Sequence, residues 1–252
     1  MKSMKASPLP AALLAAAMLC GAAPRQAAAA DMVIRQNGQT LEGNIVGSGN
    51  GNLRVKMGEA TISVPLTDVK QLRMQAPAEF TAAAAQLSRG NAKGALAALE
   101  KLNQTYAGLP AAWAERAAVM LGDAKLASGD KEGAKAAYEQ FSKTYPASVA
   151  LANLGMARLA VESGDMPGAS KLLEPLAANS AKTALPTDAD GPAFSQTFYL
   201  LGRIDEAAGD QSGALENYLK ASALFPFDQN AVADAKKRAE ALRADNPGLI
   251  VP

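Results

Sequence analysis

The spacing of apolar residues changes once along the chain, near residue 75. Between residues 31 and 75 apolar and polar residues alternate, as in the stretch LRVKM at 53–57, and a period of two is typical of half-buried strands. Pro77 suits the first turn of a helix, and from there to residue 245 the period is close to 3.6. The pattern predicts an α+β multidomain protein that is mainly α: a small β module followed by a larger helical region.

Turn-forming residues divide the β module into five short strands. Asn37-Gly38 is a strong hairpin signal, and further turns are expected at residues 47–52, 58–60 and 66–68. We expect a small, strongly bent five-stranded barrel. Its strands are predicted over residues 32–36, 40–46, 53–57, 60–65 and 70–74.

The order of hairpin, long second strand and one-turn link before the last strand resembles SH3-like or Sm-like barrels. That resemblance implies binding of peptide or RNA, or assembly into rings. However, residues 31–75 include five basic and four acidic residues, and no aromatic side chain that could stack on a base or a proline-rich peptide. We therefore expect a packing or self-association module.

A six-residue turn, Gly-(Asp or Asn)-x-x-Gly-Ala, occurs four times in the helical region, at residues 90–95, 129–134, 164–169 and 209–214. Its first Gly can adopt the left-handed conformation that ends a helix, and the Asp or Asn can cap the next helix. We expect the closing Gly-Ala to allow two helices to approach closely. Spacings of 39, 35 and 45 residues between the turns predict stacked helix pairs.

Residues that flank the turns share a further pattern. In the fourth copy Phe198, Leu201 and Gly202 precede the turn, and Tyr218 and Pro226 follow it. This pattern resembles the tetratricopeptide repeat (TPR), most fully in the second and fourth copies. The repeat positions are Gly90, Ala95, Gly122, Gly129, Ala134, Tyr138, Pro146, Gly164, Ala169, Gly202, Gly209, Ala214, Tyr218 and Pro226.

The resemblance implies a TPR-like α-solenoid that binds a protein or peptide in a concave groove. On this register the groove would present Arg116, Val119, Asp123, Leu154, Arg158, Glu162, Tyr199, Arg203 and Glu206. Tyr and Arg are common interface anchors. The alternative is a solvated helix face with ordinary one-turn pairings. The Lys and Asn clamp with which some TPR proteins hold a C-terminal carboxylate is not present in this register.

Two further segments complete the helical region. Residues 229–245 form an amphipathic pattern that we interpret as a capping helix, with Asp228 as its N-cap and residues 246–252 as a tail. Residues 178–191 are an insertion before the fourth repeat. Its Asp188 and Asp190 lack the ligand spacing of a calcium loop, so we expect a solvated loop.

Residues 1–30 have the order of a secretory signal peptide. Lys2 and Lys5 precede an uncharged apolar run, and three alanines precede Asp31, the expected first residue of the mature chain. The alternatives are a retained membrane anchor and lipidation at Cys20. The predicted organisation is thus a leader (1–30), a β-barrel (31–75), a repeat domain (76–245) and a tail (246–252).

Composition excludes several kinds of chemistry. The chain has no His, and its single Cys lies in the leader, so triads that need His and thiolate or imidazole metal sites are excluded from the mature chain. Without the leader the chain has 22 basic and 24 acidic residues, so its composition does not indicate the excess of positive charge that nucleic-acid binding needs. We expect neither metal nor cofactor.

These observations predict a non-catalytic, exported scaffold or adaptor in the bacterial cell envelope, most simply in the periplasm and without a transmembrane segment once mature. The same features would suit an accessory factor of envelope assembly or cell division. An enzyme would need a carboxylate pair such as Asp188 and Asp190, as in a carboxylate-dependent hydrolase.

Overall fold

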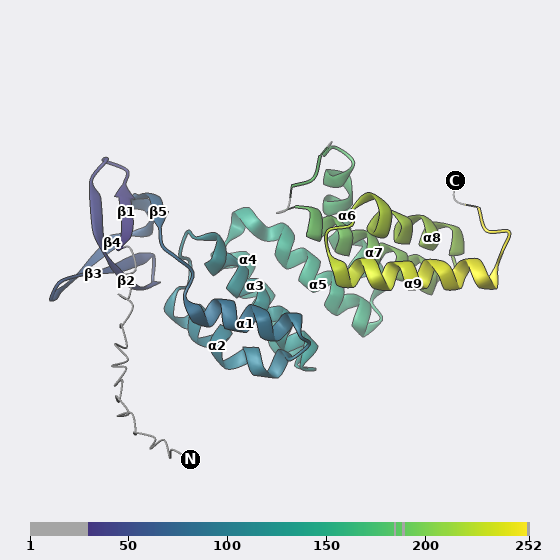
Figure 1. Ribbon diagram of the computed structural model, residues 1–252, viewed down its shortest axis with the longest axis horizontal. Coiled ribbons are helices and arrows are strands. Elements are labelled where there is room, and N and C mark those ends of the chain that lie inside the picture. Colours follow the sequence, from purple (N-terminus) through teal and green to yellow (C-terminus); the bar gives the residue numbers. More distant parts are fainter. Residues whose placement is uncertain (1–29, 184, 188–189, 251–252) are drawn as a thin grey trace, which may run out of the picture.

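The computed structural model describes residues 30–183, 185–187 and 190–250. A five-stranded antiparallel sheet lies at one end of an elongated molecule, and paired helices extend from it to the other end (Figure 1). The predicted class, α+β and mainly α, is confirmed. Apart from Ala30, the predicted leader, with Cys20, lies outside the described residues.

The sheet has the strand order β4-β3-β2-β1-β5. The long β2 pairs with β1 through its first half and with β3 through its second, and its register shifts between Ile45 and Gly47. Strands β4 and β5 are the two edges, and the pairings of the described residues include none between them, so hydrogen bonds do not close the expected barrel. The strands are β1 (Asp31–Arg35), β2 (Thr40–Gly49), β3 (Asn52–Met57), β4 (Ala60–Pro65) and β5 (Val69–Arg73).

The core of the β module is completed by residues from the helical region. Leu109, which follows the second helix, is fully buried in the same cluster as Val33 and Leu53 of the sheet. Nearby, the Ser48 hydroxyl donates a hydrogen bond to the Ala107 carbonyl oxygen at 2.9 Å. The module therefore packs against the helical region, and its core would be incomplete without Leu109.

The helices of the described ranges form four antiparallel pairs and one additional helix. Within each pair the two helices contact each other, and α1, α3, α5, α7 and α9 also contact in series, forming what we call the first-helix row. The helices are α1 (Ala78–Ser88), α2 (Ala92–Thr105), α3 (Ala112–Ala127), α4 (Lys131–Thr144), α5 (Val149–Ser163), α6 (Met166–Ser180), α7 (Gly191–Ala208), α8 (Gln211–Leu219) and α9 (Gln229–Asp245).

The four six-residue turns adopt one conformation. Their first glycines, at positions 90, 129, 164 and 209, have φ between 76° and 89°, and in each turn the Asn or Asp side chain accepts a hydrogen bond from the N–H of the closing Gly. The predicted left-handed ends and caps are confirmed. The alanines that follow, at positions 95, 134, 169 and 214, are fully buried.

The closing glycine has a different role from the one expected. A Cβ added to Gly133 would lie 2.0 Å from an oxygen of the capping Asp130, and the other three copies have the same conflict. The closing glycine therefore makes room for the cap, and only the alanine mediates close helix packing.

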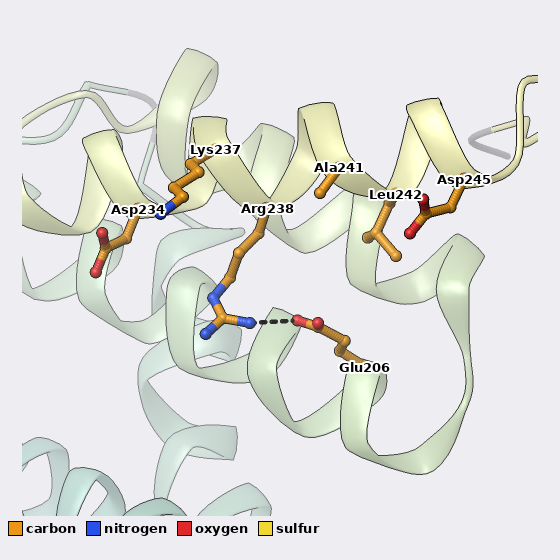
Figure 2. A pocket seen from close by; sticks show the side chains of 7 residues that line it. All are labelled: Glu206, Asp234, Lys237, Arg238, Ala241, Leu242 and Asp245. Atoms are coloured by element: carbon orange, nitrogen blue, oxygen red, sulfur yellow. Dashed lines mark hydrogen bonds and ion pairs between the residues drawn. The ribbon is translucent and has the colours of Figure 1, made fainter.

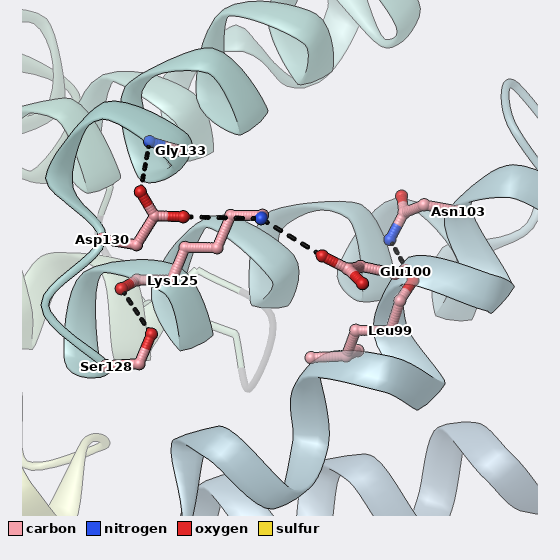
Figure 3. Close-up of polar contacts among 7 residues, drawn as sticks. All are labelled: Leu99, Glu100, Asn103, Lys125, Ser128, Asp130 and Gly133. Atoms are coloured by element: carbon pink, nitrogen blue, oxygen red, sulfur yellow. Dashed lines mark hydrogen bonds and ion pairs between the residues drawn. The ribbon is translucent and has the colours of Figure 1, made fainter.

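The second turn also connects neighbouring pairs. Asp130, which caps α4, also forms an ion pair with the Lys125 ammonium group of α3 at 3.6 Å (Figure 3). The same ammonium lies 3.2 Å from Glu100 on α2. One lysine thus joins three consecutive helices.

Two tyrosine rings lie against glycines. A Cβ added to either Gly122 on α3 or Gly155 on α5 would lie 2.3 Å from the Tyr138 ring, and one added to Gly202 would lie 2.5 Å from the Tyr218 ring. In the third pair the position of the tyrosine is Leu173. In the second and fourth pairs, the glycine of the first helix and the tyrosine of the second helix, both positions of the repeat pattern, therefore pack on each other.

The C-terminal end agrees with the sequence except for the tail. Helix α9 spans Gln229–Asp245, and the Asp228 carboxylate caps it through the N–H groups of Asn230 and Ala231. The described part of the tail, however, packs back on the protein. Leu249 contacts the α7–α9 core, and the Ser212 hydroxyl donates to the Ile250 carbonyl. The two closing prolines of the repeat pattern are exposed; Pro146 begins a 3₁₀ turn and Pro226 lies before α9.

Candidate partner-binding surface

Two similar side-chain triads connect helices of the first-helix row. The Tyr138 hydroxyl of α4 donates a hydrogen bond to Asp123 of α3 at 2.6 Å, and Arg158 of α5 forms an ion pair with the same carboxylate oxygen at 3.0 Å. At the C-terminal end, Tyr218 donates to Glu206, which also accepts from Arg238 at 2.8 Å. In both triads the arginine follows the tyrosine by 20 residues.

The environment keeps these groups in fixed protonation states. Burial, with the nearby Asp123 or Glu206 charge, raises the pKa of Tyr138 and of Tyr218, so both hydroxyls remain donors. Burial lowers the pKa of Arg158, but the Asp123 charge opposes it and the net shift is upward. Burial raises the pKa of Glu206, yet the hydrogen bonds from Tyr218 and Arg238 outweigh it and the net shift is downward. The triads therefore hold neighbouring helices together at neutral pH.

The triads engage three of the nine residues expected in a groove, namely Asp123, Arg158 and Glu206. Two others are also occupied inside the protein. Leu154 is only 4% exposed and belongs to the α5–α7 core. The Tyr199 ring packs 6.2 Å from that of Tyr218, and its hydroxyl lies 3.4 Å from Asp234 of α9.

The other four expected residues leave side chains open to a partner. Arg116 on α3 is exposed and Arg203 on α7 is half-buried, and neither forms a hydrogen bond or ion pair within the described residues. The Glu162 side chain is exposed, although its backbone carbonyl accepts a hydrogen bond from Lys131. Val119 is half-buried against the α3–α5 core. Of the nine expected residues, Arg116, Glu162 and Arg203 therefore carry charged groups without a side-chain hydrogen bond or ion pair in the described part of the chain.

A pocket of about 330 Å³ lies between α7 and α9. Figure 2 shows the Glu206–Arg238 pair below α9, where this pair forms one side of the pocket. Lys237 and Asp245 of α9 also line it. The sequence pattern of α9 predicts only a capping helix and does not indicate this site. The repeated spacing of 20 residues from tyrosine to arginine could have indicated it.

Of the acidic pair considered for catalysis, only Asp190 lies within the described residues. Asp188 lies outside the described residues, and the Asp190 carboxylate accepts a hydrogen bond from the Thr187 hydroxyl at 2.9 Å. Within the described ranges, no three acidic, His or Cys side chains gather as they would around a metal ion. None of the helices that the structure describes is both long and apolar enough to cross a membrane.

Comparison with known proteins does not assign the chain to a family. No protein-family model matches it, and a search of the curated proteins finds no similar sequence.

Proposed function

We propose that this protein is an exported, non-catalytic scaffold of the TPR type that binds a protein or peptide partner along its first-helix row. The TPR assignment is supported by the packing of small on aromatic repeat positions, Gly122 against Tyr138 and Gly202 against Tyr218. Export rests on the leader-like sequence before Asp31. The periplasm is the compartment that follows from this reading, and envelope assembly or cell division is the process that we propose.

The observation that carries the binding proposal is that Arg116 and Arg203 form no side-chain hydrogen bond or ion pair within the described residues, whereas Asp123, Arg158 and Glu206 of the same row are engaged in the triads. The triads tie α3 to α5 and α7 to α9, so we expect these helices to keep their relative positions when a partner binds. A preorganised surface loses little conformational entropy on binding. Arg116 and Arg203 would then contact carboxylates of the partner, because guanidinium groups bind them with two parallel hydrogen bonds.

The proposal is tested by affinity capture with the chain from residue 31 as bait in an envelope extract. The test variant is Arg116→Glu with Arg203→Glu. The matched control is Lys143→Glu with Lys171→Glu, which reverses two exposed charges on the second helices α4 and α6. We expect the control variant to capture a partner as well as the unmodified chain does. The test variant should capture at least tenfold less of the same partner.

The same partner should bind less strongly as salt concentration rises, because exposed charge pairs are screened. If both variants retain every partner equally, the first-helix row is not the binding surface. If purified chain binds no envelope protein at all, the scaffold function itself is wrong.

A further inference from the structure

The two edges of the sheet differ in how well they are protected against pairing with another strand. Free edges are usually guarded by charged residues, especially lysine. On β5 the side chains of Lys70 and Arg73 are exposed and provide such a guard. Strand β4 has the sequence ATISVP, which carries no charge, and its residues 60–63 are all exposed.

The hairpin geometry shows which backbone groups of β4 are unpaired. Met57 and Ala60 close the two-residue turn and form a hydrogen-bonded pair. Such pairs alternate with non-hydrogen-bonded ones in an antiparallel ladder, so Thr61 and Ser63 direct their N–H and C=O groups away from β3. These groups lie on an edge that no described segment pairs with or covers.

Ile62 is the apolar part of this edge. It pairs with the buried Val55 and so lies on the core face of the sheet, yet it is 39% exposed. Its neighbour on the same face, Val64, is only 2% exposed. The core is thus incompletely covered at Ile62, a position that an added strand would cover.

We propose that the β4 edges of two copies of this chain pair antiparallel, about a two-fold axis at Ile62. Thr61 of one copy would then lie opposite Ser63 of the other, and each of the two such pairs would exchange both of its backbone hydrogen bonds. Ile62 would face Ile62 as a non-hydrogen-bonded pair, in which side chains approach most closely. This is the self-complementary arrangement that two-fold symmetry requires.

The strand is self-complementary, which favours a second copy as the occupant. In this register the exposed, uncharged Thr61, Ile62 and Ser63 of one copy lie opposite the same three residues of the other. No like charges meet within the strand itself. A single added strand pair is smaller than a standard protein interface, so the dimer is expected to be concentration-dependent.

The test uses the chain from residue 31 in sedimentation velocity over a range of concentrations. One variant carries Thr61→Lys and Ser63→Lys, and the other carries Thr61→Glu and Ser63→Glu. Each places like charges opposite each other and should weaken dimerisation at least tenfold, whereas an equimolar mixture should recover it as a heterodimer. Circular dichroism checks that both variants retain the fold.

The matched control is Gln71→Lys on the β5 edge, which should dimerise like the unmodified chain. The proposal is overturned if the unmodified chain stays monomeric at the highest concentration, if either charged variant dimerises normally, or if the mixture does not recover. A loss of association in the control would show head-to-tail pairing of β4 with β5, which also overturns it. The test is independent of the first-helix row, since that row carries none of these substitutions.

Discussion

The contact between Gly122 and the Tyr138 ring predicts that an alanine substitution will have opposite effects in two backgrounds. Gly→Ala in a helix interior normally stabilises by about 1 kcal/mol, because glycine has the greater backbone entropy to lose. At Gly122 the new Cβ would lie 2.3 Å from the Tyr138 ring. We therefore expect Gly122→Ala to destabilise the protein.

The magnitude follows from how firmly the ring is held. Carbon atoms in good contact lie about 3.5–4.0 Å apart, so the ring or helix α3 must move by more than about 1 Å. The ring cannot move freely, since a Cβ on Gly155 of α5 would lie equally close to the same ring atom and the hydroxyl is bonded to Asp123. Overpacking of this kind costs about 1–3 kcal/mol, and after the helix gain we expect a net loss of about 1–2 kcal/mol.

The control background is Tyr138→Leu, which imitates the third helix pair. There Leu173 replaces the tyrosine, and Ala157 stands at the position of Gly122; both are buried in one core cluster. Tyr138→Leu will itself cost stability, but in its presence Gly122→Ala should be neutral or stabilise by up to about 1 kcal/mol.

The assay is urea unfolding of the four proteins in this cycle, followed by circular dichroism and by fluorescence of the single tryptophan, Trp113, which lies on α3. The tryptophan reports the affected helix even if pairs of helices unfold separately. An equal cost of Gly122→Ala in both backgrounds would refute the reasoning, because the cost would then not arise from the ring.

Two further predictions test burial at the junctions. Burial raises the pKa of Tyr145 to about 12. The folded state therefore binds the phenol proton more tightly than the unfolded state does. The stability that results is complete below about pH 10 and is lost as pH rises toward 12. Tyr145→Phe should make the free energy of unfolding fall less steeply between these pH values. Leu109→Ala should lower the free energy of unfolding by about 2–5 kcal/mol and reduce hydrogen-exchange protection in β1–β3, although Leu109 lies outside the sheet. Unchanged protection in these strands would show that the β module is stable without Leu109.

The local features of the fold were predictable because each depends on residues close together in sequence. A glycine that requires positive φ, followed by an Asp or Asn cap, determines a helix end and a helix start within six residues. Asp228 and the apolar stripe after it likewise predicted α9. The alternating pattern placed five strands whose observed bounds differ from the expected ones by no more than a few residues.

The candidate site was predicted less completely, since a helical register gives the direction of a side chain but not its partner. Arg116 is exposed and Arg203 is half-buried without a hydrogen bond or ion pair among the described residues, whereas Leu154 is buried in the core. Asp123, Arg158 and Glu206 have the same exposed-face pattern in sequence, yet they are engaged by residues on other helices. Those pairings join residues 12 to 35 positions apart, and they form only when the helices stack.

The sequence by itself determined where helices and strands begin and end, because turn glycines, caps and apolar periodicity act within a few residues. Only the tertiary structure decided which charges remain unpaired, that Leu109 completes the core of the β module, and that the closing glycine of each turn accommodates its cap. These outcomes depend on distances between atoms of separate elements. Such distances are set by how the elements pack and not by local sequence preference.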